Sequence, residues 1–183
     1  MSGKIGAKMG MVSLALAALT VGCGTPMDGD ESGLKLSSGN YWTSWIGGNQ
    51  NGTTRSASWL DNGWVTALEG REQAGYGLVN LRVVGQTDRG TTPGYWSTDN
   101  HSGSFRSTSQ VQWANGLSVR IQGGHGVINA HLLGPRNSSH LTSNYNGSSY
   151  GIRCYDDDYV IGIQTREQAG YGVVDARVFC RSR

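Results

Sequence analysis

Three aromatic side chains occupy the same position in a repeated, glycine-bounded segment, and this arrangement could serve sugar binding. Two of the segments are the identical heptapeptide REQAGYG, and the third is a diverged copy. An exposed ring between glycines can stack on a sugar ring, and weak sites gain strength by multivalency. The alternative is that each ring folds back over a neighbouring sheet. The segments are Arg71–Gly77, Arg120–Gly126 and Arg166–Gly172, and the aromatic residues are Tyr76, His125 and Tyr171.

Polar side chains near these segments could bond the hydroxyl groups of the same ligand. The candidates are the arginine that opens a repeat and the Asn or Asp that follows its glycine-rich tip. They are Arg71 with Asn80 in the first copy, and Arg166 with Asp175 in the third. Polar ladders of this kind also occur as solvated sheet faces or as contacts between sheets, so a structural role is the alternative.

The recurring carboxylates do not form a catalytic pair. A glycoside hydrolase needs two carboxyl groups about 5–10 Å apart. Glu72 and Glu167 recur, but the middle copy has Ile121 at that position. Glu69 and Glu72 have opposite parity on one strand, so they should point to opposite faces. We therefore predict no catalytic residue.

The histidines and aspartates do not suggest a metal site. The four histidines lack the spacing of metal ligands, and no third ligand accompanies His125 and His131. The run Asp156–Asp158 could contribute to a calcium site, but an acidic turn is the favoured interpretation. The sequence therefore predicts neither a metal nor a cofactor.

Each copy of the repeat predicts a β-hairpin. Apolar and polar residues alternate with period two on both sides of the tip, and there is no helical stripe. The tip Ala74–Gly77 predicts a four-residue loop, which sets the register of the two strands. The expected pairs are Gln73–Leu78, Arg71–Asn80 and Glu69–Arg82, then Arg120–Asn129 and Ser118–His131, then Arg166–Asp175 and Gln164–Arg177.

An apolar layer is expected on the opposite face of each hairpin. In every copy a large aromatic residue and a Leu or Ile precede the arginine with the same parity. Both should therefore point inward, and their burial should supply most of the stability. The pairs are Trp64 with Leu68, Trp113 with Leu117 and Tyr159 with Ile163.

Three copies of one unit predict an all-β domain with pseudo-threefold symmetry. The expected architecture is a β-prism, in which three sheets face a shared axis, and a β-trefoil is the alternative. The segments upstream of each hairpin should add one or two short strands to their copy. Among these segments, Arg55–Ser58 and Arg106–Ser109 should correspond.

The end of the third copy resembles a known family. The run Asp175–Cys180 is similar to the Asn/Asp-x-Arg-x-x-Cys strand that closes the repeats of vitelline membrane outer layer protein I. The resemblance is sharp over Arg166–Cys180 and covers the three copies in outline. It implies a β-prism with a hydrophobic centre. Lysozyme-like or sugar-transfer activity has been linked with that family.

The beginning of the chain has the features of an export signal. Residues 1–22 combine two early lysines with an apolar run that is too short to span a bilayer. Cys23 ends a sequence that resembles a bacterial lipobox, which implies lipidation, with ordinary secretion as the alternative. Residues 23–39 should form a flexible tether, and residues 40–183 should form the repeat domain. Cys154 and Cys180 remain to form a disulfide, which should staple the third copy.

The composition leaves a limited choice of partners. The formal net charge is +2 and no basic cluster is present, so nothing favours nucleic acid. We predict an exported, lipid-anchored protein of the bacterial outer membrane or cell surface that binds a glycan or cell-surface polysaccharide without turning it over. Its membrane contact would be through the lipid alone. The alternatives are a structural or adhesive envelope protein and an enzyme that acts on glycans.

Overall fold

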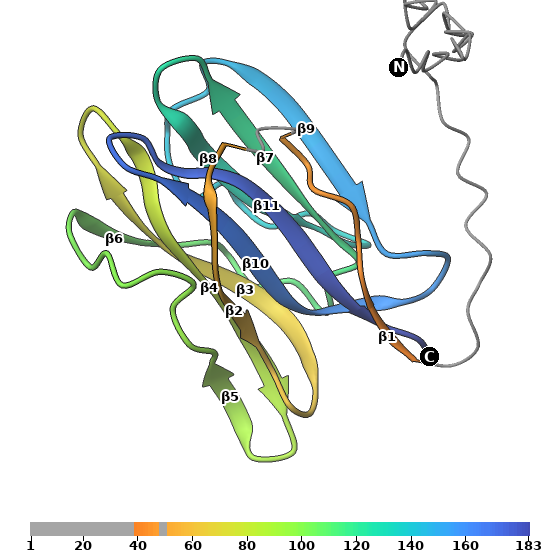
Figure 1. The fold of residues 1–183 in the computed structure, drawn as a ribbon. Helices are drawn as coiled ribbons and strands as arrows, with labels where there is room; N and C mark the ends of the chain where they lie inside the picture. The colour runs from red at the N-terminus through yellow and green to blue at the C-terminus, as the bar shows by residue number, and fades with distance from the viewer. Residues whose placement is uncertain (1–38, 48–50) are drawn as a thin grey trace, which may run out of the picture. The chain divides into compact units, whose positions relative to one another are not determined.

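The computed structural model describes residues 39–47 and 51–183, and within these ranges the chain is all-β (Figure 1). The predicted signal peptide, Cys23 and the tether up to residue 38 lie outside the described residues. The strands are β1 (Asn40–Trp42), β2 (Thr53–Trp59), β3 (Trp64–Gln73), β4 (Gly77–Thr87), β5 (Gly90–Pro93), β6 (Ser104–Ser107), β7 (Gly116–Gln122), β8 (Gly126–Leu133), β9 (Ser148–Arg153), β10 (Tyr159–Gln168) and β11 (Gly172–Arg181).

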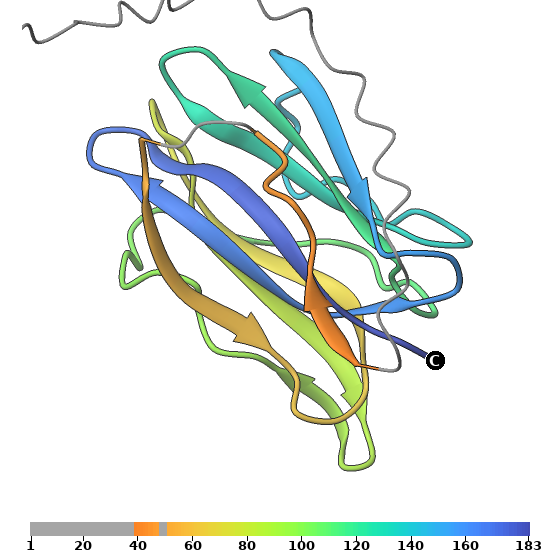
Figure 2. The same cartoon turned by 45° about the vertical axis from the view of Figure 1, so that its right-hand side comes forward.

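The strands form three antiparallel sheets, each built on one repeated hairpin. Sheet A has the order β1-β11-β10-β2, sheet B the order β5-β4-β3-β6, and sheet C the order β8-β7-β9. The two views in Figures 1 and 2 show the sheets arranged about a common centre. The predicted threefold β-prism is thus confirmed, and the β-trefoil alternative is not adopted.

The outer strands are not where the sequence analysis placed them. The strands β6 and β9 follow their hairpins along the chain and pair with β3 and β7, so they lie downstream of the hairpin and not upstream. The last hairpin, formed by β10 and β11, differs from these two. It is completed by β1 and β2 from the other end of the described chain, which pair with β11 and β10. The predicted correspondence of residues 55–58 and 106–109 is confirmed, because β2 and β6 hold equivalent edge positions.

The predicted register is correct along most of each hairpin and wrong at the tip. Arg71 lies opposite Asn80 as expected, but Gln73 lies opposite Gly77 and not Leu78. A register shift between Arg71 and Glu72 accounts for the difference. The turn closes through a bond from the Tyr76 N–H to the Gln73 carbonyl, and it has a positive φ at its third residue, Gly75.

The predicted inward aromatic residues do not enter the core. Leu68 is fully buried as expected, but Trp64 is 40% exposed, and Trp113 and Tyr159 are partly exposed. A second register shift, between Val65 and Ala67, changes the parity of the strand, so Val65 takes the inward place. The equivalent buried pairs are Ala114 with Leu117 and Val160 with Ile163.

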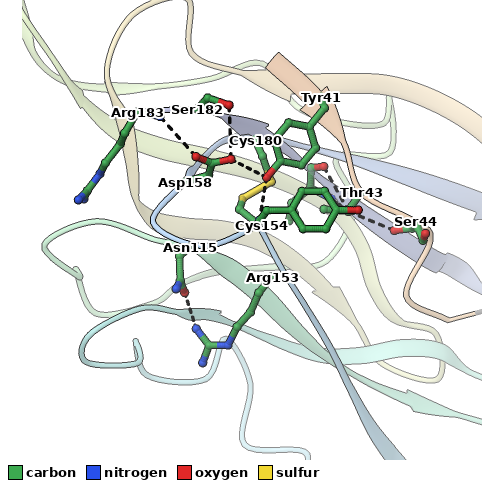
Figure 3. Close-up of a disulfide and its surroundings, with 12 residues drawn as sticks. Tyr41, Thr43, Ser44, Asn115, Arg153, Cys154, Asp158, Cys180, Ser182 and Arg183 are labelled. Carbon is green, nitrogen blue, oxygen red and sulfur yellow. Dashed lines mark hydrogen bonds between the residues drawn. A yellow bond between two sulfur atoms is a disulfide. The ribbon is translucent and has the colours of Figure 1, made fainter. Parts of the chain in front are cut away.

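A disulfide joins two of the sheets (Figure 3). Cys154 directly follows β9 of sheet C, and Cys180 lies in β11 of sheet A. The predicted pairing is confirmed, but the bridge connects neighbouring sheets and does not staple one copy. Beside it, the Tyr41 hydroxyl donates to Asp158 at 2.9 Å, so the first described strand is fixed at the same corner. Burial, the largest cause, and Asp158 raise the pKa of the Tyr41 phenol.

Candidate functional site

The three hairpin tips meet at one end of the prism through the last glycine of each repeated segment. Gly77, Gly126 and Gly172 all have positive φ, at 77°, 68° and 71°. A Cβ atom on each would lie within 2.7 Å of a backbone carbonyl oxygen in the next copy. Each glycine therefore packs against another hairpin, and the three contacts close a ring. The carbonyls belong to Val127, Val173 and Leu78 respectively.

The aromatic residues of the tips are partly accessible. Tyr76 and Tyr171 are 38% and 37% exposed. His125 is less free, since its Nδ1 lies 2.9 Å from the carbonyl oxygen of Gly75 in the first tip. His125 thus contacts the tip turn of the first copy. The role of all three rings in sugar binding stays a prediction.

A hollow of about 290 Å³ separates the first tip from the second. Its wall is mostly polar, with side chains that can donate and accept hydrogen bonds. It includes His125 but neither tyrosine. The lining residues with side-chain amides or carboxylates are Glu72, Gln73, Gln122, Asn144 and Asn146.

The predicted polar ligands Asn80 and Asp175 are completely buried. The Asn80 amide nitrogen donates to the carbonyls of Thr98 and Asn100, and its oxygen accepts from the N–H groups of Leu81 and Thr98. Asn80 thus holds the loop after β5 against sheet B. In the second copy Asn129 bonds the loop after β8 in the same way, through its contacts with Thr142 and Asn144.

Asp175 takes the place of that asparagine in the third copy. Its Oδ1 accepts from the N–H groups of Gly47 and Ala176, at 2.7 and 2.8 Å. Its Oδ2 is buried and accepts no hydrogen bond among the described residues, although Arg166 Nη1 lies 3.5 Å away. Burial raises the pKa of this carboxyl group, against the opposing effect of the backbone N–H donors and Arg166.

The predicted arginine ladders bind aromatic rings of the protein itself. In the first copy, the guanidinium groups of Arg71 and Arg82 lie 5.7 and 4.4 Å from the Trp96 ring centre. In the third, Arg166 and Arg177 lie 4.1 and 4.7 Å from the Trp45 ring. These cation–π contacts fix the following or preceding loop on the sheet. These contacts therefore favour a structural role for the polar ladders.

The second copy keeps one such contact, with the Arg120 guanidinium 5.8 Å from the Tyr145 ring centre, and adds a pair of adjacent histidines. His131 and His140 have ring centres 4.2 Å apart. Burial lowers the pKa of His131 to about 4, with smaller effects of His140 and Arg120. Burial and Arg120 also lower the pKa of His140. Both rings are therefore neutral in the folded protein at neutral pH.

The recurring glutamates are engaged in ion pairs with edge strands. Glu72 accepts from Arg106 of β6 at 2.8 Å, and Glu167 accepts from Arg55 of β2 at 2.9 Å. In the acidic run, Asp158 is buried and its backbone N–H bonds to Tyr155, which makes the run a turn. Residues 39–47 and 51–183 contain no cluster of three potential metal ligands. No helix in the same ranges has the length and apolarity to span a membrane.

The misplaced aromatic residues gather at the other end of the hairpins, away from the tips. Trp64, Trp113 and Tyr159 line a pocket of about 280 Å³ together with Arg183. The Arg183 guanidinium lies 4.6 Å from the Trp113 ring centre, and the Trp64 indole N–H donates to the Gln112 carbonyl. An arginine of the protein therefore forms part of the wall of this largely apolar pocket.

A groove that the sequence analysis missed lies at the same end, between sheets A and B. It is walled by the loop of residues 60–63 and the turn of residues 87–90, and its volume is about 300 Å³. Trp59 and Tyr95, which are 44% and 80% exposed, stand at its sides. We call it the Trp59–Tyr95 groove. The signal available in the sequence was two aromatic residues next to Asp61-Asn62 and Asp88-Arg89, but nothing in the repeat brings these segments together.

Comparison with known proteins identifies the fold. No family model and no curated protein matches this chain. Similar solved structures include Calystegia sepium agglutinin, with a TM-score of 0.59, 10% identity, and coverage of 79% of this chain and 98% of that one. Frutalin from Artocarpus incisa has a TM-score of 0.58 and 9% identity, with 81% and 100% covered. A mannose-specific jacalin-related lectin from Morus nigra, in complex with mannose, has a TM-score of 0.55 and 10% identity, with 80% and 97% covered.

Proposed function

We propose that this chain is a sugar-binding protein that recognises glycans without turning them over. The observation that carries the proposal is the tip end of the prism, where Tyr76 and Tyr171 are exposed on glycine-bounded turns and a polar hollow lies between the first two tips. Solved proteins of this fold that are described as mannose-binding lectins support it. A glycan-acting enzyme is less well supported, because both recurring glutamates are held in ion pairs by arginines.

The chemistry of the tip end suits a sugar. The faces of Tyr76 and Tyr171 can pack against the C–H bonds of a pyranose, and the side-chain amides and carboxylate of the hollow can bond its hydroxyls. Arg71, Asn80, Arg166 and Asp175 act in this proposal by fixing the loops around the tips. Because the tips adjoin one another, one branched glycan could contact more than one of them.

We also propose that the protein is exported. Residues 1–22 would be a signal peptide, Cys23 the lipidated residue and residues 23–39 a tether to the outer membrane or cell surface, with secretion as the alternative. The Cys154–Cys180 disulfide supports an oxidising compartment outside the cytosol. Mass spectrometry of the mature N-terminus tests this. A diacylated Cys23 is the expected result, and an unmodified later residue would favour secretion.

A glycan array tests the proposed tip site. The double variant Tyr76→Ala/Tyr171→Ala should lose most of its binding, since both stacking faces are removed without any change in the glycines. Tyr150→Ala is the matched control, because Tyr150 is also exposed, at 43%, but lies on β9 of sheet C. Equal binding by the wild type and the double variant would refute the tip site.

A structural or adhesive role in the envelope is the second candidate. It is favoured by exposed aromatic side chains on the edge strands of sheets B and C, where Phe105 and Tyr150 are 48% and 43% exposed. Such side chains suit contacts with another protein. Retention on the cell surface without binding to any glycan would support this role over the first.

A further inference from the structure

We propose that the Trp59–Tyr95 groove is a second sugar-binding site, which takes the pyranose ring of an uncharged sugar. The inference rests on the proposed sugar-binding function for its ligand class, but the groove is separate from the tips. Along the first hairpin the pair Trp64–Gln86 marks one end and Gln73–Gly77 the other, and the groove adjoins the former. Figures 1 and 2 show the β4–β5 hairpin extending away from the tips at this end.

Backbone contacts at Gly94 fix the position of Tyr95 beside the groove. Gly94 lets the segment after β5 approach β2 closely, since a Cβ atom there would lie 2.7 Å from Ser58 Oγ and 3.2 Å from the Trp59 carbonyl oxygen. The Gly94 N–H also donates to the Val83 carbonyl at 2.8 Å. These contacts place Tyr95 next to the end of β2. The site is therefore formed before any ligand arrives, which lowers the entropic cost of binding.

The two aromatic side chains offer free faces. Tyr95 is 80% exposed, the highest value among the exposed large hydrophobic residues of the described chain. Neither Tyr95 nor Trp59 stacks on another ring or lies under an arginine within residues 39–47 and 51–183. Trp45 and Trp96, in contrast, are covered by arginines. A ring without an internal partner can pack against the C–H face of a sugar.

Several polar side chains of the groove keep groups that are free to bond a ligand. Asp61 Oδ1 accepts from the Trp59 indole N–H at 3.2 Å, which orients the ring and leaves Oδ2 available. The side chains of Asn62, Asp88 and Arg89 are exposed and make no hydrogen bond within the described part of the chain. By comparison, hydrogen bonds to loops of the protein occupy the side chains of Asn80, Asn129 and Asp175.

The ligand class follows from the lining. The volume of about 300 Å³ is at the lower end of the range for small-ligand clefts, roughly 300–1,000 Å³, which suits one or two sugar rings. Carboxylates and an amide can bond vicinal hydroxyl groups. Two aspartates against one arginine make the lining net negative, which disfavours a sugar that carries a carboxylate.

The repeat does not explain this groove. In sheet C no strand corresponds to β5, and in sheet A the equivalent strand β1 comes from the other end of the described chain. Within the described residues, the β4–β5 hairpin with its turn at residues 87–90 is therefore found in the first copy alone. The repeated scaffold forms in the other copies without this turn. Ligand binding would therefore explain why the turn carries exposed polar residues.

Ligand titration by calorimetry or saturation-transfer NMR tests the inference. The probes are the methyl glycosides of mannose, galactose, glucose and glucuronic acid at millimolar concentration. Tyr95→Ala should weaken binding of at least one neutral glycoside by about tenfold or more, while Tyr95→Phe, which retains the ring, should bind as the wild type does. Asp61→Asn should weaken it severalfold. The glucuronide should bind more weakly than the glucoside.

The Tyr76→Ala/Tyr171→Ala variant separates this site from the tips. If it keeps saturable binding that Tyr95→Ala loses, the groove is supported and the tip site is not. If Tyr95→Ala binds every probe as the wild type does, the inference is overturned, even where the tip variant loses binding. Failure of the wild type to bind any probe would overturn the groove as well, and preference for the glucuronide would refute the ligand class.

Discussion

The backbone N–H of Gly47 donates a hydrogen bond of 2.7 Å to Oδ1 of Asp175, across 128 residues of sequence. This contact holds the loop after β1 on the last hairpin, at the position where Asn80 and Asn129 hold the corresponding loops of the other copies. Only the third copy uses a group that can ionise. The three positions therefore form an internal comparison of Asp and Asn in one structural setting.

We expect Asp175→Asn to stabilise the protein at neutral pH by about 1 kcal/mol, because an amide avoids a buried charge and can donate where the carboxylate cannot. The folded pKa of Asp175 is raised, so its favourable contribution is present below the unfolded pKa and lost as pH rises through the folded pKa. The advantage of the variant should therefore shrink in acid. Urea denaturation at neutral and acidic pH measures it.

The reverse substitution, Asn129→Asp, is the matched control. It should destabilise at neutral pH, since a carboxylate would face the carbonyl oxygens of Thr142 and Asn144. A loss of stability in Asp175→Asn at neutral pH would show that the ion pair with Arg166 outweighs the cost of burial.

We expect His131 to make the protein sensitive to mild acid. Its folded pKa of about 4 lies below the ordinary histidine value of 6.5, so the unfolded state takes up the proton first as pH falls. Stability should be full above the unfolded value and should decline between these two pH values. The half-buried ring is partly screened, so we expect a loss of about 1 kcal/mol. His131→Gln should reduce the dependence of the free energy of unfolding on pH between these two values. An unchanged dependence would contradict the role given to His131.

The contacts between the three hairpin tips predict a large difference between Gly124 and Gly126, two glycines on either side of His125 in the second copy. Gly126→Ala should destabilise by about 3 kcal/mol or more, since its Cβ would meet the Val173 carbonyl oxygen at 2.5 Å in addition to the cost of a positive φ. Gly124→Ala should lower the free energy of unfolding by about 1 kcal/mol, from the positive φ alone, because nothing lies within 4 Å of its Cβ. Thermal unfolding compares them. Equal effects would mean that the copies do not interlock at the tips.

Loss of the disulfide should weaken the junction of sheets A and C. The separation of 26 residues predicts a loss of about 3 kcal/mol in the double variant Cys154→Ser/Cys180→Ser. Denaturant unfolding of the wild type with and without a reductant gives the same comparison without mutation. An unchanged unfolding midpoint in both experiments would contradict it.

The periodic part of the fold could be predicted, because it depends on local alternation. Leu68, Leu117 and Ile163 were placed in the core correctly, and Arg71 was paired correctly with Asn80. Trp64 was misplaced because a single extra residue near Thr66 reverses the parity of the strand. Such a bulge has no clear sequence signature, and the alternation on either side of it looks regular.

The candidate sites were harder to predict for a different reason. The repeat pattern predicts equivalent positions for Tyr76 and Tyr171, because both lie in the repeated heptapeptide. It gives no signal for Trp59 and Tyr95, which lie outside it. The groove between these two residues joins two sheets and depends on the close approach at Gly94. Contacts between segments that share no pattern are set by the three-dimensional path of the chain, which alternation along one strand does not reveal.

The composition of sheet A has a consequence for biosynthesis. Arg55 of β2 and its partner Glu167 of β10 are 112 residues apart, so the first strands leave the ribosome long before the hairpin that receives them. Sheets B and C can assemble meanwhile from consecutive segments. Until translation reaches β10 and β11, the edges of β1 and β2 are unpaired, and a nascent chain that stalls there would be exposed to aggregation.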